Sequence, residues 1–245
     1  MGEKLFFVFL VCTVLGISCV ECIVGGHRSV SNAAPFMVSV QNPTHICGGA
    51  LVGTDWVLAT ASCVQGKSNL KVLVGSDRLL TNMDRVTVSR TNIHTGYNQT
   101  SGANNIALLK LDRSVTSSRV KTIALNDVAV TTGLTTEFYG WGSLNYGSSA
   151  KSNALQVLYQ RAISATDCRA KYQSTLILQN DQFCAHVQPG QAACLYDQGG
   201  PLVGYSSKKL IGIYDHGILC SGKYPDAFTS VYNHKTWIET TMAAR

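Results

Sequence analysis

The sequence has 245 residues, enough for one large domain or two compact halves with a well-buried core. Charged residues are only 14% and glycine is abundant at 22 residues, which excludes a charge-rich coiled coil and disfavours intrinsic disorder. The formal net charge of +6 comes from dispersed lysines and arginines, so a solvated basic surface is favoured over a patch for nucleic acid.

The chain begins with an apolar segment. Residues 5–17 form an uncharged run after Lys4, too short to cross a bilayer, which needs about 20 apolar residues. We therefore expect residues 1–22 to be a secretory signal peptide. Its removal leaves an extracellular protein that is expected to have no attachment to a membrane.

Two cleavage positions fit the small-residue rule. Cleavage after Ser18 gives a mature start at Cys19, and cleavage after Cys22 gives a start at Ile23. Of the nine cysteines in the chain, six lie after Cys22. Six is an even set that suits disulfide formation in an oxidising compartment. A start at Cys19 would leave eight, with Cys19 and Cys22 needing partners that the rest of the chain does not obviously supply, so Ile23 is the favoured start and Cys19 the alternative.

After Ile23, short strand-like runs alternate with turns rich in glycine, asparagine, serine and proline, as in an all-β barrel or sandwich. Two segments predict helices, Thr166–Gln173 and Val231–Ala244. The expected strands are Met37–Val40, Gly49–Val52, Trp56–Ala59, Lys71–Val74, Arg85–Ser89, Ile106–Lys110, Thr135–Tyr139, Gln156–Ala162, Pro201–Val203, Leu210–Tyr214 and Ala227–Val231. The stretch around Ala124–Thr132 lacks a strong pattern and could join two halves.

Five local strings occur in a fixed order along the chain. They are Ile23–Gly26, Cys47–Leu51 followed by Trp56–Cys63, Asn105–Leu111, Tyr139–Gly142 and Cys194–Leu202. Together they resemble the trypsin/chymotrypsin family of serine proteases, and the similarity covers residues 23–245. The resemblance implies two six-stranded antiparallel β-barrels, formed by residues 23–125 and 126–245, with a cleft between them and a C-terminal helix.

The resemblance also pairs the six remaining cysteines. The number of cysteines alone does not choose among the possible pairings. The pairs that the family implies are Cys47–Cys63, Cys168–Cys184 and Cys194–Cys220.

The residues that the family uses for catalysis are replaced. Its mechanism needs a serine nucleophile, a histidine base and an aspartate that orients the base. The corresponding positions hold Gln198, Ser62 and Asn105. An amide is no useful nucleophile, a serine is no general base at neutral pH, and an asparagine has no charge to stabilise an imidazolium. The first oxyanion donor, usually a glycine, is Tyr196, whose side chain disfavours the required backbone angles and could fill the cleft.

One alternative keeps the protein active with an unorthodox catalytic set. Ser62 could be a nucleophile and His45, His94 or His216 its base. None of these residues has a sequence context that would place it for this role, so we expect no catalysis.

The side-chain pocket of the family is altered too. Its base position is Ala192, so the acidic base of trypsin is absent. Asp226 stands where a wall glycine is usual. Its carboxylate could attract a basic group, or could hydrogen-bond Tyr224 and block the pocket, and the blocked pocket is favoured. The wall strand, usually Ser-Trp-Gly, reads Asp215, His216 and Gly217.

Asp197 is retained. In the family this carboxylate pairs with the amine freed by zymogen cleavage, which here would be Ile23. The preceding residue is Cys22 rather than lysine or arginine, so a trypsin-like activator has no site and signal peptidase would free Ile23 directly. Alternatively, Cys22 is retained and Asp197 has another partner.

Two further features concern modification and metals. Asn98, Gln99 and Thr100 form an N-glycosylation sequon in a turn-like stretch. No zinc-ligand spacing is present, and the apolar and basic residues within 77–84 disfavour a calcium site. We expect no metal and no cofactor.

These observations favour a secreted, non-catalytic homologue of the trypsin-like proteases. We expect a monomer that binds an extracellular protein, such as a protease, a protease substrate or a cascade component, as a cofactor or decoy in a proteolytic, immune or reproductive process. We expect no nucleic-acid partner. The alternatives are an active serine-type endopeptidase and a secreted carrier or structural protein.

Overall fold

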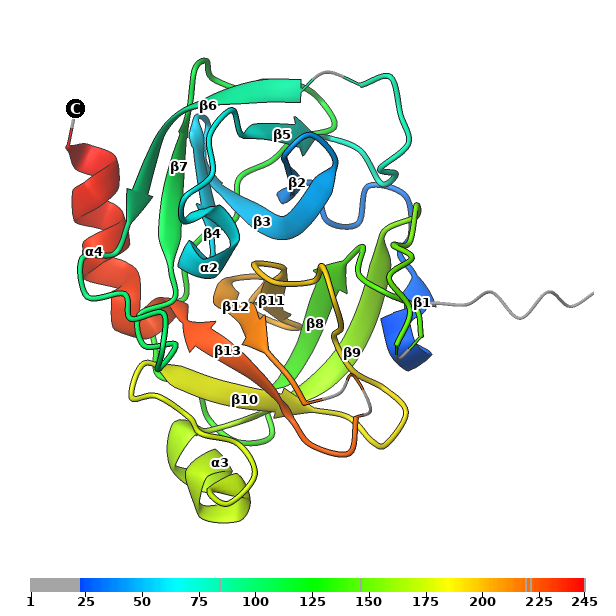
Figure 1. Ribbon diagram of the computed structural model, residues 1–245, viewed down its shortest axis with the longest axis vertical. Coiled ribbons are helices and arrows are strands. Elements are labelled where there is room, and N and C mark those ends of the chain that lie inside the picture. The colour runs from blue at the N-terminus through cyan, green and yellow to red at the C-terminus, as the bar shows by residue number, and fades with distance from the viewer. Residues whose placement is uncertain (1–22, 84, 146, 219, 221, 245) are drawn as a thin grey trace, which may run out of the picture.

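A computed structural model describes residues 23–244 except 84, 146, 219 and 221 (Figure 1). The expected signal peptide, and with it the choice between Cys19 and Ile23 as the mature start, lies outside the described residues.

The first half of the chain forms a closed antiparallel barrel with the strand order β2-β3-β4-β7-β6-β5. Its valine- and leucine-rich strands turn buried side chains such as Val40, Val57 and Leu109 into one core. The strands are β2 (Met37–Gln41), β3 (His45–Gly53), β4 (Trp56–Ala59), β5 (Lys71–Val74), β6 (Arg85–Ile93) and β7 (Ala107–Leu111).

The second half forms a second antiparallel barrel, ordered β9-β10-β13-β12-β11-β8 and closed by pairing of β8 with β9. Its core includes Phe138, Phe183 and Phe228, which contact one another as aromatic pairs. The strands are β8 (Thr135–Gly140), β9 (Gln156–Ile163), β10 (Gln182–His186), β11 (Pro201–Gly204), β12 (Leu210–His216) and β13 (Asp226–Ser230). The expected pair of six-stranded barrels is confirmed.

A short strand links the two halves. β1 (His27–Arg28) precedes the first barrel in the chain but pairs with β9 of the second. Residues 112–134 connect the two closed barrels, and the start of the chain lies against the second one. The boundary at residues 125 and 126 stays a prediction. Neither β1 nor β10 was expected from the sequence.

The helices lie outside the barrels (Figure 1). They are η1 (Ile23–Gly25), α2 (Ala61–Val64), α3 (Ala165–Tyr172) and α4 (Val231–Ala243). The expected C-terminal helix is thus confirmed. Ser230 caps α4 by accepting a hydrogen bond from the backbone N–H of Asn233, and Ile238 of α4 packs into the core between the barrels, beside Trp141 and Leu58.

The three expected disulfides are present: Cys47–Cys63, Cys168–Cys184 and Cys194–Cys220. The first holds the start of β3 against α2, and the last fixes the loop before β11. Within the described residues, none of the helices is long and apolar enough to cross a membrane.

Candidate functional site

The three positions that replace the catalytic residues lie on elements of both barrels. Ser62 is on α2, Asn105 lies just before β7, and Gln198 lies in the loop before β11. Ser62 and Gln198 line one open pocket of ≈ 370 Å³, together with Lys67. The structure therefore brings together the residues that the motifs predicted.

Ser62 and Asn105 hydrogen-bond each other twice. The Ser62 backbone N–H donates to Asn105 Oδ1 at 2.8 Å, and Asn105 Nδ2 donates to Ser62 Oγ at 3.1 Å. The serine hydroxyl therefore accepts from an amide instead of donating to a base. No imidazole in the described part of the chain hydrogen-bonds this hydroxyl.

Asp215 supplies a buried carboxylate behind this pair. Asn105 Nδ2 also donates to Asp215 Oδ1 at 2.8 Å, so one amide nitrogen serves both Ser62 and Asp215. The motifs predicted Asp215 in the pocket wall, but its side chain is only 6% exposed and points to Asn105. The other groups that hydrogen-bond its two oxygens are Gln182, Thr229 and His216.

Sequence reasoning missed Gln182 and Thr229 as parts of this site. They come from β10 and β13, and Thr229 Oγ1 lies 3.1 Å from Asp215 Oδ2 and 3.3 Å from the carbonyl oxygen of Asn105. No motif marks either residue, because their role arises only when the second barrel closes.

The loop of residues 194–197, which contains the expected oxyanion position, includes one residue with a left-handed backbone conformation. Tyr196 has φ 71°, and the Asp197 N–H donates to the Cys194 carbonyl at 3.1 Å, as in a type II turn with Tyr196 at its third position. The left-handed φ is therefore present although a tyrosine side chain disfavours it. The tyrosine is held from both ends, because His45 Nε2 donates to its carbonyl at 3.1 Å and Lys151 Nζ lies 4.4 Å from its ring centre.

Both ring nitrogens of His45 take part in hydrogen bonds. Its Nδ1 lies 2.8 Å from Ser39 Oγ, which accepts in turn from Gln41 Nε2 at 3.1 Å. Since Nε2 faces a carbonyl, it carries the proton and Nδ1 accepts from Ser39. Burial lowers the pKa of His45 to about 4, so the ring is neutral at physiological pH.

The other two histidines weighed as bases are also occupied. His94 Nδ1 accepts from the Gly96 N–H at 3.1 Å, and His216 Nδ1 lies 3.3 Å from Asp215 Oδ1. Neither hydrogen-bonds Ser62, so the structure does not assemble the alternative catalytic set.

Asp197 is fully buried beneath the loop. Its carboxylate accepts from the backbone N–H groups of Gly142 at 2.7 Å and Cys194 at 2.9 Å. A Cβ at Gly142 would collide with this carboxylate, which explains the glycine there. Burial raises the pKa of Asp197 to about 7. Ile23 is buried in the core of the second barrel, but its ion pair with Asp197 stays a prediction.

Asp226, at the expected wall of the side-chain pocket, is buried. Its Oδ2 accepts from the Ala193 N–H at 2.9 Å and from Gln160 Nε2 at 3.1 Å, not from Tyr224. A Cβ at Gly217 would collide with its other oxygen. Burial raises the pKa of Asp226 to about 7. Ala192 is buried as well. This arrangement agrees with a blocked pocket, and the absence of ligand binding there stays a prediction.

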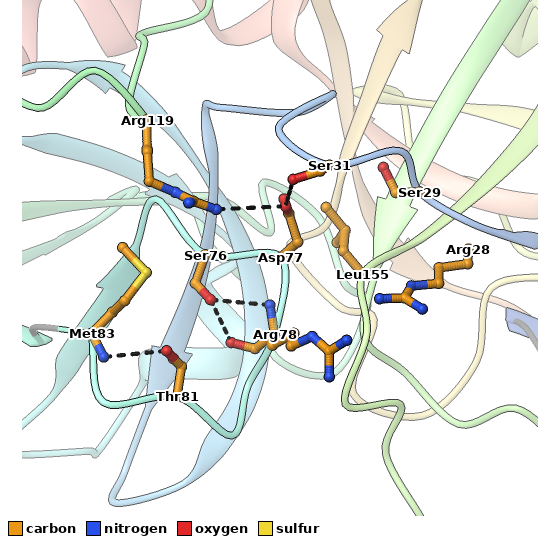
Figure 2. A pocket seen from close by; sticks show the side chains of 10 residues that line it. All are labelled: Arg28, Ser29, Ser31, Ser76, Asp77, Arg78, Thr81, Met83, Arg119 and Leu155. Atoms are coloured by element: carbon orange, nitrogen blue, oxygen red, sulfur yellow. Dashed lines mark hydrogen bonds and ion pairs between the residues drawn. The ribbon is translucent and has the colours of Figure 1, made fainter.

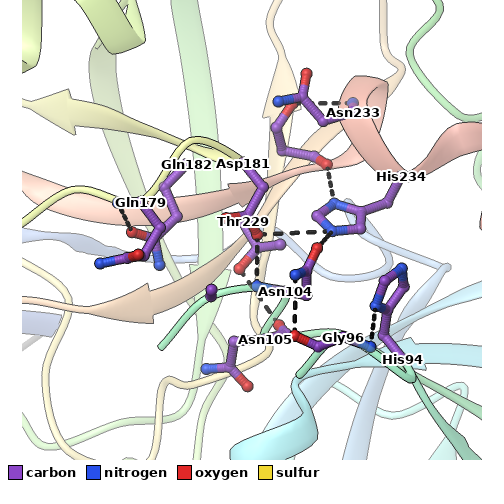
Figure 3. Close-up of polar contacts among 12 residues, drawn as sticks. His94, Gly96, Asn104, Asn105, Gln179, Asp181, Gln182, Thr229, Asn233 and His234 are labelled. Atoms are coloured by element: carbon purple, nitrogen blue, oxygen red, sulfur yellow. Dashed lines mark hydrogen bonds and ion pairs between the residues drawn. The ribbon is translucent and has the colours of Figure 1, made fainter. Parts of the chain in front are cut away.

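A second polar cluster lies next to Asn105 (Figure 3). His234 of α4 places Nδ1 2.8 Å from the Ser230 carbonyl and Nε2 3.2 Å from Asn104 Oδ1. Asn104 Nδ2 donates to the Gly96 carbonyl at 3.0 Å, which fixes the direction of the amide. Both nitrogens of His234 thus face oxygen acceptors, with Asp181 Oδ2 3.6 Å from Nε2. The cluster joins a loop of the first barrel to α4.

Asn98 lies in an exposed turn. Its Oδ1 accepts from the N–H groups of Thr100 and Ser101 at 2.9 and 3.0 Å. Its glycosylation stays a prediction.

The comparisons with known proteins identify the family. The family model described as Trypsin matches residues 23–238. The chain belongs to the trypsin family of serine proteases. It is 35% identical over 228 residues to Trypsin I-P1 of Gallus gallus, covering 91% of this chain and 90% of that protein. It is 31% identical over 232 residues to Serine protease 1 of Homo sapiens, with 91% and 90% covered.

A solved structure supports the same family. Neuropsin, a serine protease expressed in the limbic system of mouse brain, matches with a TM-score of 0.81 and 27% identity, covering 89% of this chain and 99% of its own. Membership in the trypsin family fixes the scaffold. Whether this member cleaves peptides depends on the residues at positions 62, 105 and 198.

Proposed function

We propose that this member of the trypsin family is a secreted, non-catalytic protein that acts by binding an extracellular protein. The observation that carries the proposal is the pair of hydrogen bonds between Ser62 and Asn105. In this arrangement the residue at the histidine position is held by an amide, and no histidine among the described residues hydrogen-bonds Ser62 to act as its base.

The chemistry of Gln198 supports the same conclusion. A glutamine amide at the nucleophile position cannot form the acyl intermediate of the family's mechanism. Disabling such a triad lowers the rate by about 10⁶-fold. The left-handed turn at Tyr196 and the buried Asp197 are kept, so Gln198 lies directly after a loop that retains these two features.

The expected signal peptide and the three disulfides, which suit an oxidising compartment, support an extracellular location. A trypsin-like surface without the reaction fits a protease, a protease substrate or a cascade component as the partner. The protein would then work as a cofactor or decoy, as a monomer and without a cofactor of its own.

Activity-based labelling tests the catalytic half of the proposal. The mature chain is expected to resist a fluorophosphonate probe and to leave Arg, Phe and Ala reporter peptides uncleaved, whereas an active trypsin in the same buffer reacts with both. Labelling that disappears in Ser62→Ala or Gln198→Ala would overturn the proposal.

Binding is tested with proteins of the fluid into which the chain is secreted. The purified mature chain, immobilised without reduction of its disulfides, is expected to retain a protease or protease substrate and to change the cleavage rate of that protease. Retention of no such protein, or retention without any change in cleavage, would argue for a carrier or structural protein instead.

A further inference from the structure

A cavity of ≈ 500 Å³ lies apart from the site just described, where residues 76–83 meet the start of the chain and the segment before β9 (Figure 2). Three arginines and four hydroxyl-bearing side chains dominate its wall. The residues that line it are Arg28, Ser29, Ser31, Ser76, Asp77, Arg78, Thr81, Met83, Arg119 and Leu155. The volume falls within the roughly 300–1,000 Å³ of small-molecule sites.

Backbone pairing places two of the arginines next to each other. Arg28 on β1 is opposite Gln156, and Arg78 forms an isolated antiparallel bridge with Ala154. Their partners are two residues apart, so the two arginines lie about 7 Å apart along one edge and on the same face of an extended chain. The Leu155 N–H donates to the Asp77 carbonyl and its own carbonyl accepts from the Ser29 N–H, so both segments are fixed to this edge.

The two guanidinium groups point toward each other across the cavity (Figure 2). Within the described part of the chain, neither has a hydrogen-bond or ion-pair partner. Adjacent like charges repel, and nothing among these residues offsets the repulsion of Arg28 and Arg78. An anion held between them would do so.

The two other charged residues of the cavity, Asp77 and Arg119, already have partners within the chain. Asp77 Oδ2 accepts from Ser31 Oγ at 3.1 Å and from the Asn32 N–H at 3.0 Å, and lies 3.9 Å from a nitrogen of Arg119. Arg119 also donates to the Gly75 carbonyl at 3.0 Å. The carboxylate is therefore turned away from the pair of free arginines and does not neutralise it.

We propose that this cavity binds a sulfate or phosphate ester carried on a compact polar molecule such as a monosaccharide. The guanidinium groups of Arg28 and Arg78 each present a planar fork of N–H donors that matches the oxygens of a tetrahedral anion. Ser29, Ser31, Ser76 and Thr81 also line the cavity. The three serine hydroxyls already donate their protons to Val30, Asp77 and Arg78, so their oxygens remain as acceptors for sugar hydroxyls. The inference does not depend on whether the chain is catalytic.

Calorimetry on the disulfide-bonded mature chain tests the proposal, with glucose 6-sulfate, glucose 6-phosphate, glucose and inorganic sulfate as separate ligands. At least one of the two esters should bind, and which one binds identifies the anion. Glucose should not bind, and inorganic sulfate should bind more weakly than the ester. No binding of either ester at millimolar concentration would overturn the proposal, and equal affinity for inorganic sulfate would overturn its sugar component.

Matched variants locate the binding. Arg28→Gln and Arg78→Gln should each weaken the binding of the ester about ten-fold, because each removes a charge-assisted hydrogen bond. Arg90→Gln removes the same charge from the exposed face of β6 and should leave the affinity unchanged. An equal loss in Arg90→Gln would show attraction by net charge alone and would overturn the site. Thermal unfolding of each variant confirms that it is folded.

Discussion

Asn105 lies between Ser62 and Asp215 and donates hydrogen bonds to both through the same amide nitrogen. In the family, the position of Asn105 holds an aspartate. In this chain that position is an amide, and the carboxylate is the buried Asp215, which accepts a hydrogen bond from Asn105. An aspartate at position 105 would put two carboxylates within about 3 Å of each other, and such a pair holds one proton and ionises fully only with difficulty.

Rebuilding the triad alone should therefore fail. The variant Ser62→His, Asn105→Asp, Gln198→Ser is expected to react with a fluorophosphonate near the background rate, because a partly protonated aspartate at position 105 cannot orient the new histidine. Adding Asp215→Ser should raise the labelling rate by about 100-fold or more, since misorienting the histidine costs about 10⁴-fold in this mechanism.

Tyr196→Gly in the triple variant is the matched comparison. Tyr196 already has the left-handed backbone that the oxyanion turn needs, so this change should raise the labelling rate less than Asp215→Ser does. A triple variant that reacts as fast as the one carrying Asp215→Ser would contradict the electrostatic argument. The comparison requires chains that start at Ile23.

Asp226 should make stability depend on pH. Its pKa is raised from 3.8 to about 7, so the folded state keeps a proton that the unfolded state loses. The contribution of protonated Asp226 to the free energy of unfolding is complete below about pH 4 and is lost as the pH rises through 7. Asp226→Asn should stabilise the protein by about 1–3 kcal/mol at pH 8 and by little at pH 4.5.

Urea unfolding at the two pH values measures this difference. Asp112→Asn, at an exposed position, serves as the control and should change neither value appreciably. An Asp226→Asn variant that is destabilised equally at both pH values would show that its hydrogen-bond geometry, and not its charge, governs the site.

The C-terminal helix α4 contains one buried histidine, His234. His234→Ala in α4 should lower the free energy of unfolding by about 1–3 kcal/mol, because it leaves Asn104 Oδ1 without its hydrogen-bond partner and removes a buried ring. His27→Ala, on the exposed strand β1, should have little effect. Urea unfolding compares the two variants, and equal effects would contradict a specific role of His234 in joining the barrels.

The strands with alternating or continuous β-branched residues were predictable from the sequence, and β4 and β5 have the predicted limits. β10 was missed because its ends are Gln182 and His186, and β1 because two residues carry no pattern.

In the site, the motifs located Ser62, Asn105 and Gln198. The contact of Asn105 with Asp215 joins residues 110 positions apart and depends on the packing of two barrels, so no local pattern could show it.

Maturation should affect the whole molecule through Asp197. Without a cation beside it, burial raises the pKa of this carboxyl to about 7. A free amine at Ile23 would pair with the carboxylate, so the chain starting at Ile23 should unfold at a higher temperature at pH 7 than one with an extra glycine before Ile23. A pair worth about 1 kcal/mol would raise Tm by roughly 2–4 °C.

The pH dependence of this difference in Tm tests whether the ion pair between Ile23 and Asp197 causes it. The difference in Tm between the two chains should disappear below about pH 4, where the Asp197 carboxyl is protonated in both chains. It should fade above about pH 9, as the Ile23 amine loses its proton. Differential scanning fluorimetry measures both limits. Mass spectrometry of the secreted protein should give Ile23 as the first residue, and a start at Cys19 would contradict direct maturation.

The shared amide of Asn105 also constrains how this chain could change over evolutionary time. A single substitution at position 62 or 198 adds one catalytic group without the others, and a substitution at position 105 sets an aspartate against Asp215. Each first step toward proteolysis is thus neutral or costly, and no single step is rewarded with activity. Under the proposed non-catalytic function, the exchange of amide and carboxylate between positions 105 and 215 makes a stepwise return to proteolysis unfavourable.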